Sequence, residues 1–315
     1  MTADPDRVTV VRCGKGKTEA ARSLHGGESP WWVEITAPDG SVHPAILRTP
    51  SSRVTLEQIA TNAAALVVAA RHGLPAPRLL AAGATTTLET VLPGTSTWPA
   101  APSVALLRSA GAAIARVHAV TIEPRPELPW RPRPIAVDDF AADRREGRMP
   151  TTALLRRADE RVRAIEPPRA PAVFVHGDVW PGNTLVRGGE VCALIDWKTA
   201  GVGHPGVDLG ELRKQVAILY DDDAPGHVLE GWELASGTRA AHVPYWDAVA
   251  ALNTPTQLYS PHATLRRDAF LAAALRAAGP PPGPGRSGTP APPAAPGPGP
   301  RLCSRPGTGS GRGPG

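Results

Sequence analysis

The stretch that decides the fold runs from residue 173 to 208 and reads VFVHGDVWPGNTLVRGGEVCALIDWKTAGVGHPGVD. It places three oxygen-bearing side chains in order: Asp178, then Asn183 five residues later, then Asp196 thirteen residues after that. An apolar run leads into each of the two acids. This pattern predicts that each acid lies at the end of a short strand.

Between Asn183 and Asp196 the sequence predicts a hairpin. Residues 184–186 and 191–195 are strand-like, and the RGGE between them is typical of a tight turn. Such a hairpin returns Asp196 to the neighbourhood of Asn183. Mg²⁺ binds carboxylate and amide oxygens and keeps waters and phosphate oxygens as its other ligands. Asp178 then remains available to accept a proton from an attacking hydroxyl.

The Asp-x-x-x-x-Asn spacing, followed by an Asp at a strand end, resembles the catalytic loop and metal-binding acid of the protein-kinase-like fold. His176-Gly177-Asp178 and Ile195-Asp196-Trp197 are similar to the aminoglycoside phosphotransferase and choline kinase branch, which phosphorylates small molecules. The segment GHPGVDL at 203–209 is similar to the Pro-x-x-Asp-Leu segment of that branch. The resemblance implies an α+β fold of two lobes. An antiparallel sheet with one helix would form the N-lobe, and a mainly helical C-lobe would carry the catalytic hairpin.

The resemblance also implies a role for each polar residue of the stretch. Asp178 is expected to be the catalytic residue, and Asn183 and Asp196 are expected to hold Mg²⁺. His176 and Asp208 are expected to support the loop, with His176 acting as a hydrogen-bonding brace rather than a titrating group. Each Asp or Asn taken alone is equally explained as a turn former. Their combination at these spacings favours the functional interpretation.

A second group of residues is predicted to bind the nucleotide. The glycines of HGGES at 25–29 would let backbone N–H groups approach a phosphate, although a plain hairpin turn explains them as well. The segment LETVLPG at 88–94 resembles the strand and hinge that bind adenine. A P-loop at 14–18 fails, because its earlier glycine falls at Val11. The predicted nucleotide contacts are Gly26, Gly27, Ser29, Arg48, Glu89 and Val91.

Two residues depart from the pattern of the family. Arg48 stands at the strand position where a lysine is expected, and Asn62 stands where the helix should carry its glutamate partner. Arginine binds phosphate through two parallel hydrogen bonds, so it can replace lysine there. Asn62 would hydrogen-bond Arg48 without a charge. These departures bear on nucleotide affinity more than on the chemistry.

We expect an N-lobe at 1–93, a C-lobe at 94–278 and a disordered tail at 279–315, because the tail holds 12 Pro and 11 Gly in 37 residues. Apolar spacing predicts one N-lobe helix, capped by Thr55 with Gln58 and stopped by Gly73. The predicted helices span 56–70, 103–118, 151–165, 208–219 and 265–275, and the predicted loops span 124–134 and 201–205.

Composition sets limits on function. The formal charge is +5, and the tail contributes four arginines and no acid, so the rest is near neutral. We therefore expect no nucleic-acid partner. Three scattered cysteines, no membrane-length apolar run and no signal-like start favour a cytoplasmic protein without a membrane partner, present as a monomer or homodimer.

The predicted activity is phosphoryl transfer from ATP, or GTP, to a hydroxyl of a small molecule. The acceptor stays open among an aminoglycoside, a macrolide, choline and another metabolite. Asp222, Glu230 and Trp232 are candidate contacts for a cationic sugar, although a solvated acidic loop beside core aromatics explains them as well. The alternatives are a nucleotide-binding pseudokinase and a metal-dependent hydrolase using His176, Asp178, Asp196 and His204.

Overall fold

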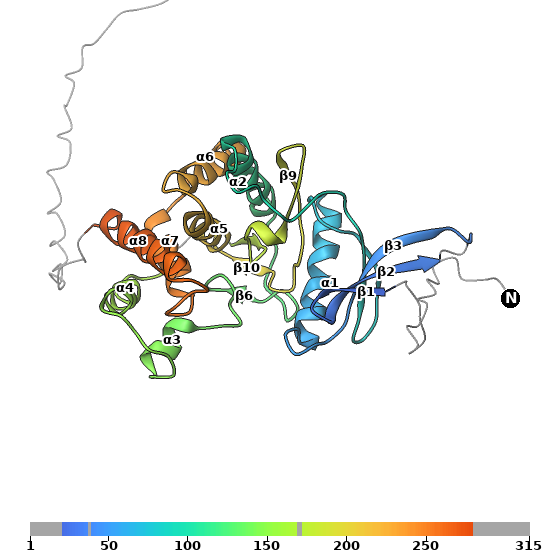
Figure 1. The fold of residues 1–315 in the computed structure, drawn as a ribbon, viewed down its shortest axis with the longest axis horizontal. Coiled ribbons are helices and arrows are strands. Elements are labelled where there is room, and N and C mark those ends of the chain that lie inside the picture. The colour runs from blue at the N-terminus through green and yellow to red at the C-terminus, as the bar shows by residue number, and fades with distance from the viewer. Residues whose placement is uncertain (1–20, 37–38, 169–171, 280–315) are drawn as a thin grey trace, which may run out of the picture. The chain divides into compact units, whose positions relative to one another are not determined.

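The computed structural model describes residues 21–36, 39–168 and 172–279 (Figure 1). It has an α+β, protein-kinase-like fold with an antiparallel N-terminal sheet followed by a mainly helical region. The failed P-loop at 14–18 and nearly all of the predicted tail lie outside the described residues.

The N-terminal sheet has five antiparallel strands in the order β1-β2-β3-β5-β4. Val33, Ile35, Ala45 and Leu88 form its small buried cluster. The first two strands are joined by a turn at Gly26 and Gly27, which have φ of 63° and 94°. The strands are β1 Ala21–His25, β2 Glu28–Thr36, β3 Val42–Arg48, β4 Leu79–Ala82 and β5 Thr87–Thr90.

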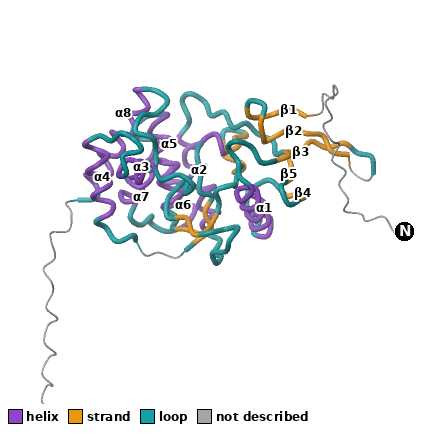
Figure 2. The backbone as a smooth tube through the Cα atoms, turned by 90° about the horizontal axis from the view of Figure 1, so that it is seen from below, coloured by secondary structure: helices purple, strands orange, loops and turns teal. Residues whose placement is uncertain are grey.

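One helix, α1 (Leu56–Arg71), lies beside these strands (Figure 2). The predicted capping box is present: Gln58 N donates to Thr55 Oγ1 at 3.2 Å, and Thr55 N donates to Gln58 Oε1 at 2.9 Å. Gly73 follows the helix with φ of 62°, a conformation that suits glycine at a helix end. Leu66 and Ala69 lie on its buried face.

The remaining helices form the larger part of the fold. Figure 1 shows α2 and α6 side by side, and two glycines permit their close approach. A Cβ at Gly111 would lie 2.0 Å from the carbonyl oxygen of Val228, and one at Gly231 would lie 2.0 Å from that of Arg108. The helices are α2 Val104–His118, α3 Phe140–Arg145, α4 Ala153–Arg163, α5 Gly206–Leu219, α6 Ala224–Ser236, α7 Val243–Leu252 and α8 Pro261–Ala277.

The hairpin predicted between Asn183 and Asp196 is present. Strands β8 (Thr184–Arg187) and β9 (Glu190–Leu194) pair antiparallel, and the turn residues Gly188 and Gly189 have φ of 63° and 84°. A 3₁₀ turn, η1 (Pro181–Asn183), leads into β8. Two glycines with positive φ are what a two-residue hairpin turn requires.

Some sequence predictions on local structure are wrong. The helices α3, α6 and α7 were not predicted, because proline, glycine and short length obscure their periodicity. The two predicted loops contain short strands, β6 (Trp130–Arg131) and β10 (Gly201–Gly203), which form a sheet with β7 (Val173–Val175). Val104 opens the first turn of α2 directly after the cap Ser103 and is 40% exposed.

The largest apolar core combines residues of α1 with residues of the helical region. Leu66, Leu107, Ile114, Phe174 and Leu212 belong to it. Among the described residues, no helix has both the length and the apolar character that crossing a bilayer requires.

Candidate active site

The loop that carries Asp178 is fixed from behind by a buried carboxylate. Asp208, in the first turn of α5, accepts hydrogen bonds from His176 N at 2.8 Å and Gly177 N at 2.7 Å. Gly177 has φ of 83°, and a Cβ there would lie 2.2 Å from the carbonyl oxygen of Thr199. Only glycine fits this position. These contacts fix the backbone conformation of the loop and, with it, the position of Asp178.

His176 joins this loop to the strand that precedes Asp196. Its Nε2 lies 2.9 Å from the carbonyl oxygen of Ile195, and the N–H of Asp178 lies 3.3 Å from its Nδ1. The ring packs 4.5 Å from that of Trp197. Burial lowers the pKa of His176, so the ring is neutral at neutral pH. The structure thus places His176 as a hydrogen-bonding bridge.

Asp178 and Asn183 lie in direct contact. The amide Nδ2 of Asn183 donates to the carbonyl oxygen of Asp178 at 2.9 Å and to its carboxylate Oδ2 at 3.1 Å. This orientation turns the amide oxygen of Asn183 away from Asp178. Burial raises the pKa of the Asp178 carboxyl to about 7, against the lowering effect of Lys198.

The hairpin brings Asp196 back beside Asn183, because Ile195 N donates to the carbonyl oxygen of Asn183 at 2.9 Å. Asp196 has φ of 66°, in the left-handed region that few residues other than glycine adopt. Its Oδ1 accepts from Arg48 at 2.9 Å, and its Oδ2 contacts the ammonium group of Lys198. Burial acts to raise the pKa of Asp196, but Arg48 and Lys198 outweigh it and hold the pKa below its usual value.

Arg48 is held by a carboxylate from the sheet rather than from the helix. Its Nε donates to Glu89 Oε1 at 2.7 Å, and Asn62 Nδ2 donates to the same oxygen at 2.6 Å. The strand register explains this contact: Thr87 lies opposite Arg48, so Glu89, two residues further on, is its diagonal neighbour on the same face. Asn62 was expected to bond Arg48 itself, and that prediction is wrong. It bonds Glu89 instead.

Arg48 is a buried cation that is paired with two carboxylates, those of Glu89 and Asp196. Its side chain is 9% exposed and that of Glu89 is 2% exposed. Burial acts to lower the pKa of Arg48, but Glu89 and Asp196 outweigh it and raise the pKa. Glu89 was predicted to contact the nucleotide as part of the hinge. That prediction concerns the backbone of the hinge and stays a prediction; the side chain of Glu89 points to Arg48.

Lys198 was not predicted to be part of this site, yet it contacts Asp196. It stands two residues after Asp196, and no lysine lies between it and Lys17. The position of this isolated lysine, two residues after the predicted metal-binding acid, was the signal that could have identified it. A second pair, Glu211 and Lys214, was not predicted either; these residues form a fully buried ion pair at 2.7 Å in α5 and influence the pKa of Asp178.

The other predicted nucleotide contacts are spread along the N-terminal sheet. Gly26 and Gly27 form the exposed β1–β2 turn, which suits either a phosphate loop or a plain hairpin. Ser29 is buried, and its hydroxyl accepts from Thr49 N at 2.9 Å. Its hydroxyl therefore anchors the end of β3 instead of facing a ligand. Val91 follows β5 directly and is 37% exposed.

The three candidate substrate residues do not converge. Asp222 is exposed in the turn before α6, with Oδ1 3.6 Å from Arg266. Glu230 lies in α6, where Arg108 binds both carboxylate oxygens at 2.7 and 2.9 Å. Trp232 is buried, and its Nε1 donates to His118 at 2.9 Å. The expected acidic loop is therefore largely a helix, and the described contacts give the cationic-sugar prediction no support.

The residues around Asp178 fit a hard cation. Within the described parts of the chain, no three His, Cys, Asp or Glu side chains gather into a metal cluster. One carboxylate, Asp196, and one amide oxygen, Asn183, are instead the kind of protein ligands that Mg²⁺ takes when a nucleotide supplies the rest. The pairing of Asp196 with Arg48 and Lys198 shows that this carboxylate attracts positive charge.

Comparison with known families agrees with this geometry. A family model described as the phosphotransferase enzyme family matches residues 20–252. The chain belongs to this family. It is accordingly a small-molecule phosphotransferase, as the resemblance of the catalytic stretch predicted. No curated protein matched the chain in the corresponding sequence comparison.

Solved structures of phosphotransferases share the fold. Macrolide 2'-phosphotransferase MphH from Brachybacterium faecium is 21% identical with a TM-score of 0.53, covering 82% of this chain and 93% of that one. A putative aminoglycoside phosphotransferase from Ralstonia eutropha is 13% identical with a TM-score of 0.56, covering 84% and 93%. The amicoumacin kinase hAmiN, solved with AMP-PNP and Ca²⁺, is 13% identical with a TM-score of 0.55, covering 83% and 89%. At these identities the likeness establishes the fold.

Proposed function

We propose that this family member transfers the γ-phosphoryl group of ATP, or GTP, to a hydroxyl group of a small molecule. The observation that carries the proposal is the convergence of Asp178 from the loop after β7, Asn183 from η1 and Asp196 from the end of β9, beside the buried cation Arg48. Acid, amide, second acid and cation are the components that phosphoryl transfer uses for positioning and charge neutralisation. The nucleotide and metal bound by the relative hAmiN support this assignment.

Asp178 orients the acceptor hydroxyl and receives its proton. The carboxylate is held in place by the amide of Asn183, and its loop is anchored through Asp208. A base fixed in this way removes the orientational freedom of the attacking group. Mg²⁺, when bound with the nucleotide, would neutralise charge on the phosphates, and Asn183 and Asp196 would hold it.

Arg48 binds the phosphate oxygens, with Glu89 and Asn62 holding its guanidinium group in position. Lys198 adds a second cation beside Asp196. The backbone of Gly26 and Gly27 would cover the phosphates from the β1–β2 turn. In this scheme residues 1–93 act as the nucleotide-binding lobe and 94–278 as the catalytic lobe, with the reaction in the cytoplasm.

One observation favours a second candidate. Both carboxylate oxygens of Asp196 are engaged by cations from the chain itself, Arg48 and Lys198. A pseudokinase that binds nucleotide with little or no metal would show such an arrangement. The intact pairing of Asp178 with Asn183 argues for the enzyme, because a binding protein has no need of a positioned base.

The test is nucleotide consumption with a library of hydroxyl-bearing acceptors, including aminoglycosides, macrolides and amino alcohols. A phosphotransferase consumes ATP or GTP only when the right acceptor is present, and a phosphate ester of that acceptor appears. A pseudokinase binds nucleotide and consumes none with any acceptor. A metal-dependent hydrolase releases phosphate, or cleaves a library member, without forming the ester.

A further inference from the structure

Lys198 directly follows a tryptophan that fixes the backbone around it. Trp197 is fully buried, its ring stacks 5.4 Å from that of Phe174, and its Nε1 donates to the carbonyl oxygen of Leu194 at 3.0 Å. Ala200 N donates to the carbonyl oxygen of Trp197 at 3.0 Å. The segment that carries Lys198 is therefore held on both sides, and the ammonium group extends from a fixed backbone.

Lys198 lies beside the loop of Asp178 as well as beside Asp196. Its ammonium group contacts Asp196 Oδ2. The next residue in the chain, Thr199, packs against the loop: a Cβ added at Gly177 would lie 2.2 Å from the carbonyl oxygen of Thr199. Since Gly177 directly precedes Asp178, the backbone next to Lys198 touches the backbone next to the proposed base.

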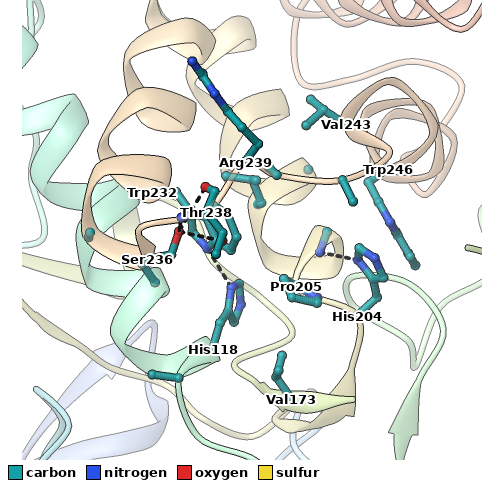
Figure 3. Close-up of a pocket in the computed structure, with 18 of the residues that line it drawn as sticks. His118, Val173, His204, Pro205, Trp232, Ser236, Thr238, Arg239, Val243 and Trp246 are labelled. Carbon is teal, nitrogen blue, oxygen red and sulfur yellow. Dashed lines mark hydrogen bonds between the residues drawn. The ribbon is translucent and has the colours of Figure 1, made fainter. Parts of the chain in front are cut away.

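The loop against which Thr199 packs is firmly braced. Thr199 Oγ1 donates to the carbonyl oxygen of His176 at 3.3 Å, and His176 N donates to Asp208 at 2.8 Å. His118 Nε2 lies 3.1 Å from the carboxylate of Asp208, and Trp232 Nε1 donates to His118 Nδ1 at 2.9 Å (Figure 3). These contacts fix the spacing between the lysine and the loop.

Lys198 has fewer partners than the other cation at Asp196. Arg48 is shared between two carboxylates, Glu89 and Asp196, and its side chain is 9% exposed. Across the described ranges of the chain, Asp196 is the one partner of Lys198, whose side chain is 20% exposed. An ammonium group carries three hydrogens, so Lys198 can donate to a ligand while it stays beside Asp196.

The charge of Lys198 acts on both acids. Burial raises the pKa of Asp178 to about 7, and Lys198 is the strongest of the charges that oppose this rise. Burial also acts to raise the pKa of Asp196, but Arg48 and then Lys198 hold it below its usual value. In phosphoryl transfer the moving group passes from the metal-bound nucleotide to the acceptor held by the base. The charge of Lys198 therefore reaches both ends of that path.

We propose that Lys198 is a catalytic residue whose ammonium group contacts the γ-phosphoryl group during its transfer. This role rests on the proposed function. The bond between the acceptor oxygen and phosphorus forms as the bond between phosphorus and the bridging oxygen breaks. The electron pair stays on the nucleoside diphosphate, and the hydroxyl proton goes to Asp178. Lys198 stays protonated throughout and neutralises charge on the phosphoryl oxygens.

The first test measures binding, because a contact with the γ-phosphate distinguishes two nucleotides. Calorimetric titrations with AMP-PNP and with ADP, both in Mg²⁺, compare wild type with Lys198→Met, which removes the charge and keeps a long side chain. The ratio of AMP-PNP affinity to ADP affinity should fall about tenfold, since ADP lacks the γ-phosphate. An unchanged ratio would overturn the proposal, because a purely structural loss weakens both nucleotides alike. GMP-PNP and GDP replace this pair if the protein binds only guanine nucleotides.

The second test measures turnover with the acceptor that the library identifies. Lys198→Met should lower turnover by a factor on the order of 10² to 10³, and Lys198→Arg should restore part of it. Arg187→Met removes an exposed cation at the end of β8 in the same hairpin, and as the matched control it should change neither turnover nor the affinity ratio.

The outcomes separate this proposal from the proposed function. If wild type and Lys198→Met transfer phosphate at the same rate, the role of Lys198 is overturned and the proposed function stands. If wild type transfers phosphate to no acceptor, the proposed function fails, and the catalytic role of Lys198 fails with it.

Discussion

The segment from Asp178 to Lys198, called here the catalytic side, differs from the cluster of Arg48, Asn62 and Glu89, called here the clamp, in how far apart its contacting residues lie along the chain. Asn183 contacts Asp178 over five residues, and Lys198 contacts Asp196 over two. Arg48, in contrast, reaches Glu89 over 41 residues and Asp196 over 148. The catalytic side is therefore assembled locally, whereas the clamp depends on how strands and helix meet. The clamp is also where the chain departs from its family's pattern.

The largest effect should come from the catalytic side. Asp178→Asn removes the proposed base while keeping the shape of the side chain, so turnover should fall by a factor on the order of 10² to 10⁴. Initial rates of phosphate-ester formation measure it. Asp222→Asn, which changes an exposed carboxylate, is the control and should leave the rate unaltered. Comparable losses in the two variants would remove the special role of Asp178.

On the clamp side, Arg48→Ala should raise the Michaelis constant for ATP and lower turnover, at a combined cost of about 2–4 kcal/mol. Arg48→Lys should restore much of the activity, because lysine still supplies the charge although it loses the two-pronged contact. Steady-state kinetics over a range of ATP concentrations separates the two parameters. Unchanged kinetics in Arg48→Ala would mean that other groups hold the phosphates.

A further test asks whether the carboxylate that pairs with Arg48 can be moved from β5 to α1. Glu89→Gln should raise the Michaelis constant for ATP roughly tenfold, because Arg48 loses a buried charged partner. The double variant Asn62→Glu with Glu89→Gln moves the acid onto α1, and Asn62 already contacts residue 89 at 2.6 Å. It should recover most of the loss. If the single variant matches wild type, Glu89 does not position Arg48.

The smallest effect on activity is expected at Ser29. Because its hydroxyl is buried and bonded to Thr49 N, Ser29→Ala should lower the free energy of unfolding by about 1 kcal/mol. The Michaelis constant for ATP should change less than about twofold, since a hydroxyl engaged with the backbone is worth little to the nucleotide. Denaturant unfolding and kinetics are measured on the same sample. A large kinetic change with unaltered stability would restore Ser29 as a nucleotide contact.

The features that could be predicted from the sequence are those that residues close together in the chain determine. The hairpin followed from two glycines between apolar runs, and α1 followed from the Thr55–Gln58 capping box and its spacing. The partner of Arg48 could not be predicted this way, since strand register decides it: Glu89 is diagonal to Arg48 only because Thr87 lies opposite. The helix α6 was missed because Pro225 and Gly231 conceal a segment that tertiary packing against α2 makes helical.

The two acids are assigned to different partners, and this assignment is decisive: Asp178 serves the acceptor, and Asp196 serves the metal and nucleotide. Calorimetric titration of a non-hydrolysable ATP analogue, with and without Mg²⁺, tests it most directly in wild type, Asp178→Asn and Asp196→Ala. This assignment of the acids predicts that Asp178→Asn binds the analogue within a few-fold of wild type. It predicts that Asp196→Ala loses the Mg²⁺-dependent part of the affinity, because a hard cation depends on carboxylate charge. Undiminished Mg²⁺-dependent binding in Asp196→Ala, or its loss in Asp178→Asn, would show that the two acids do not have these separate roles.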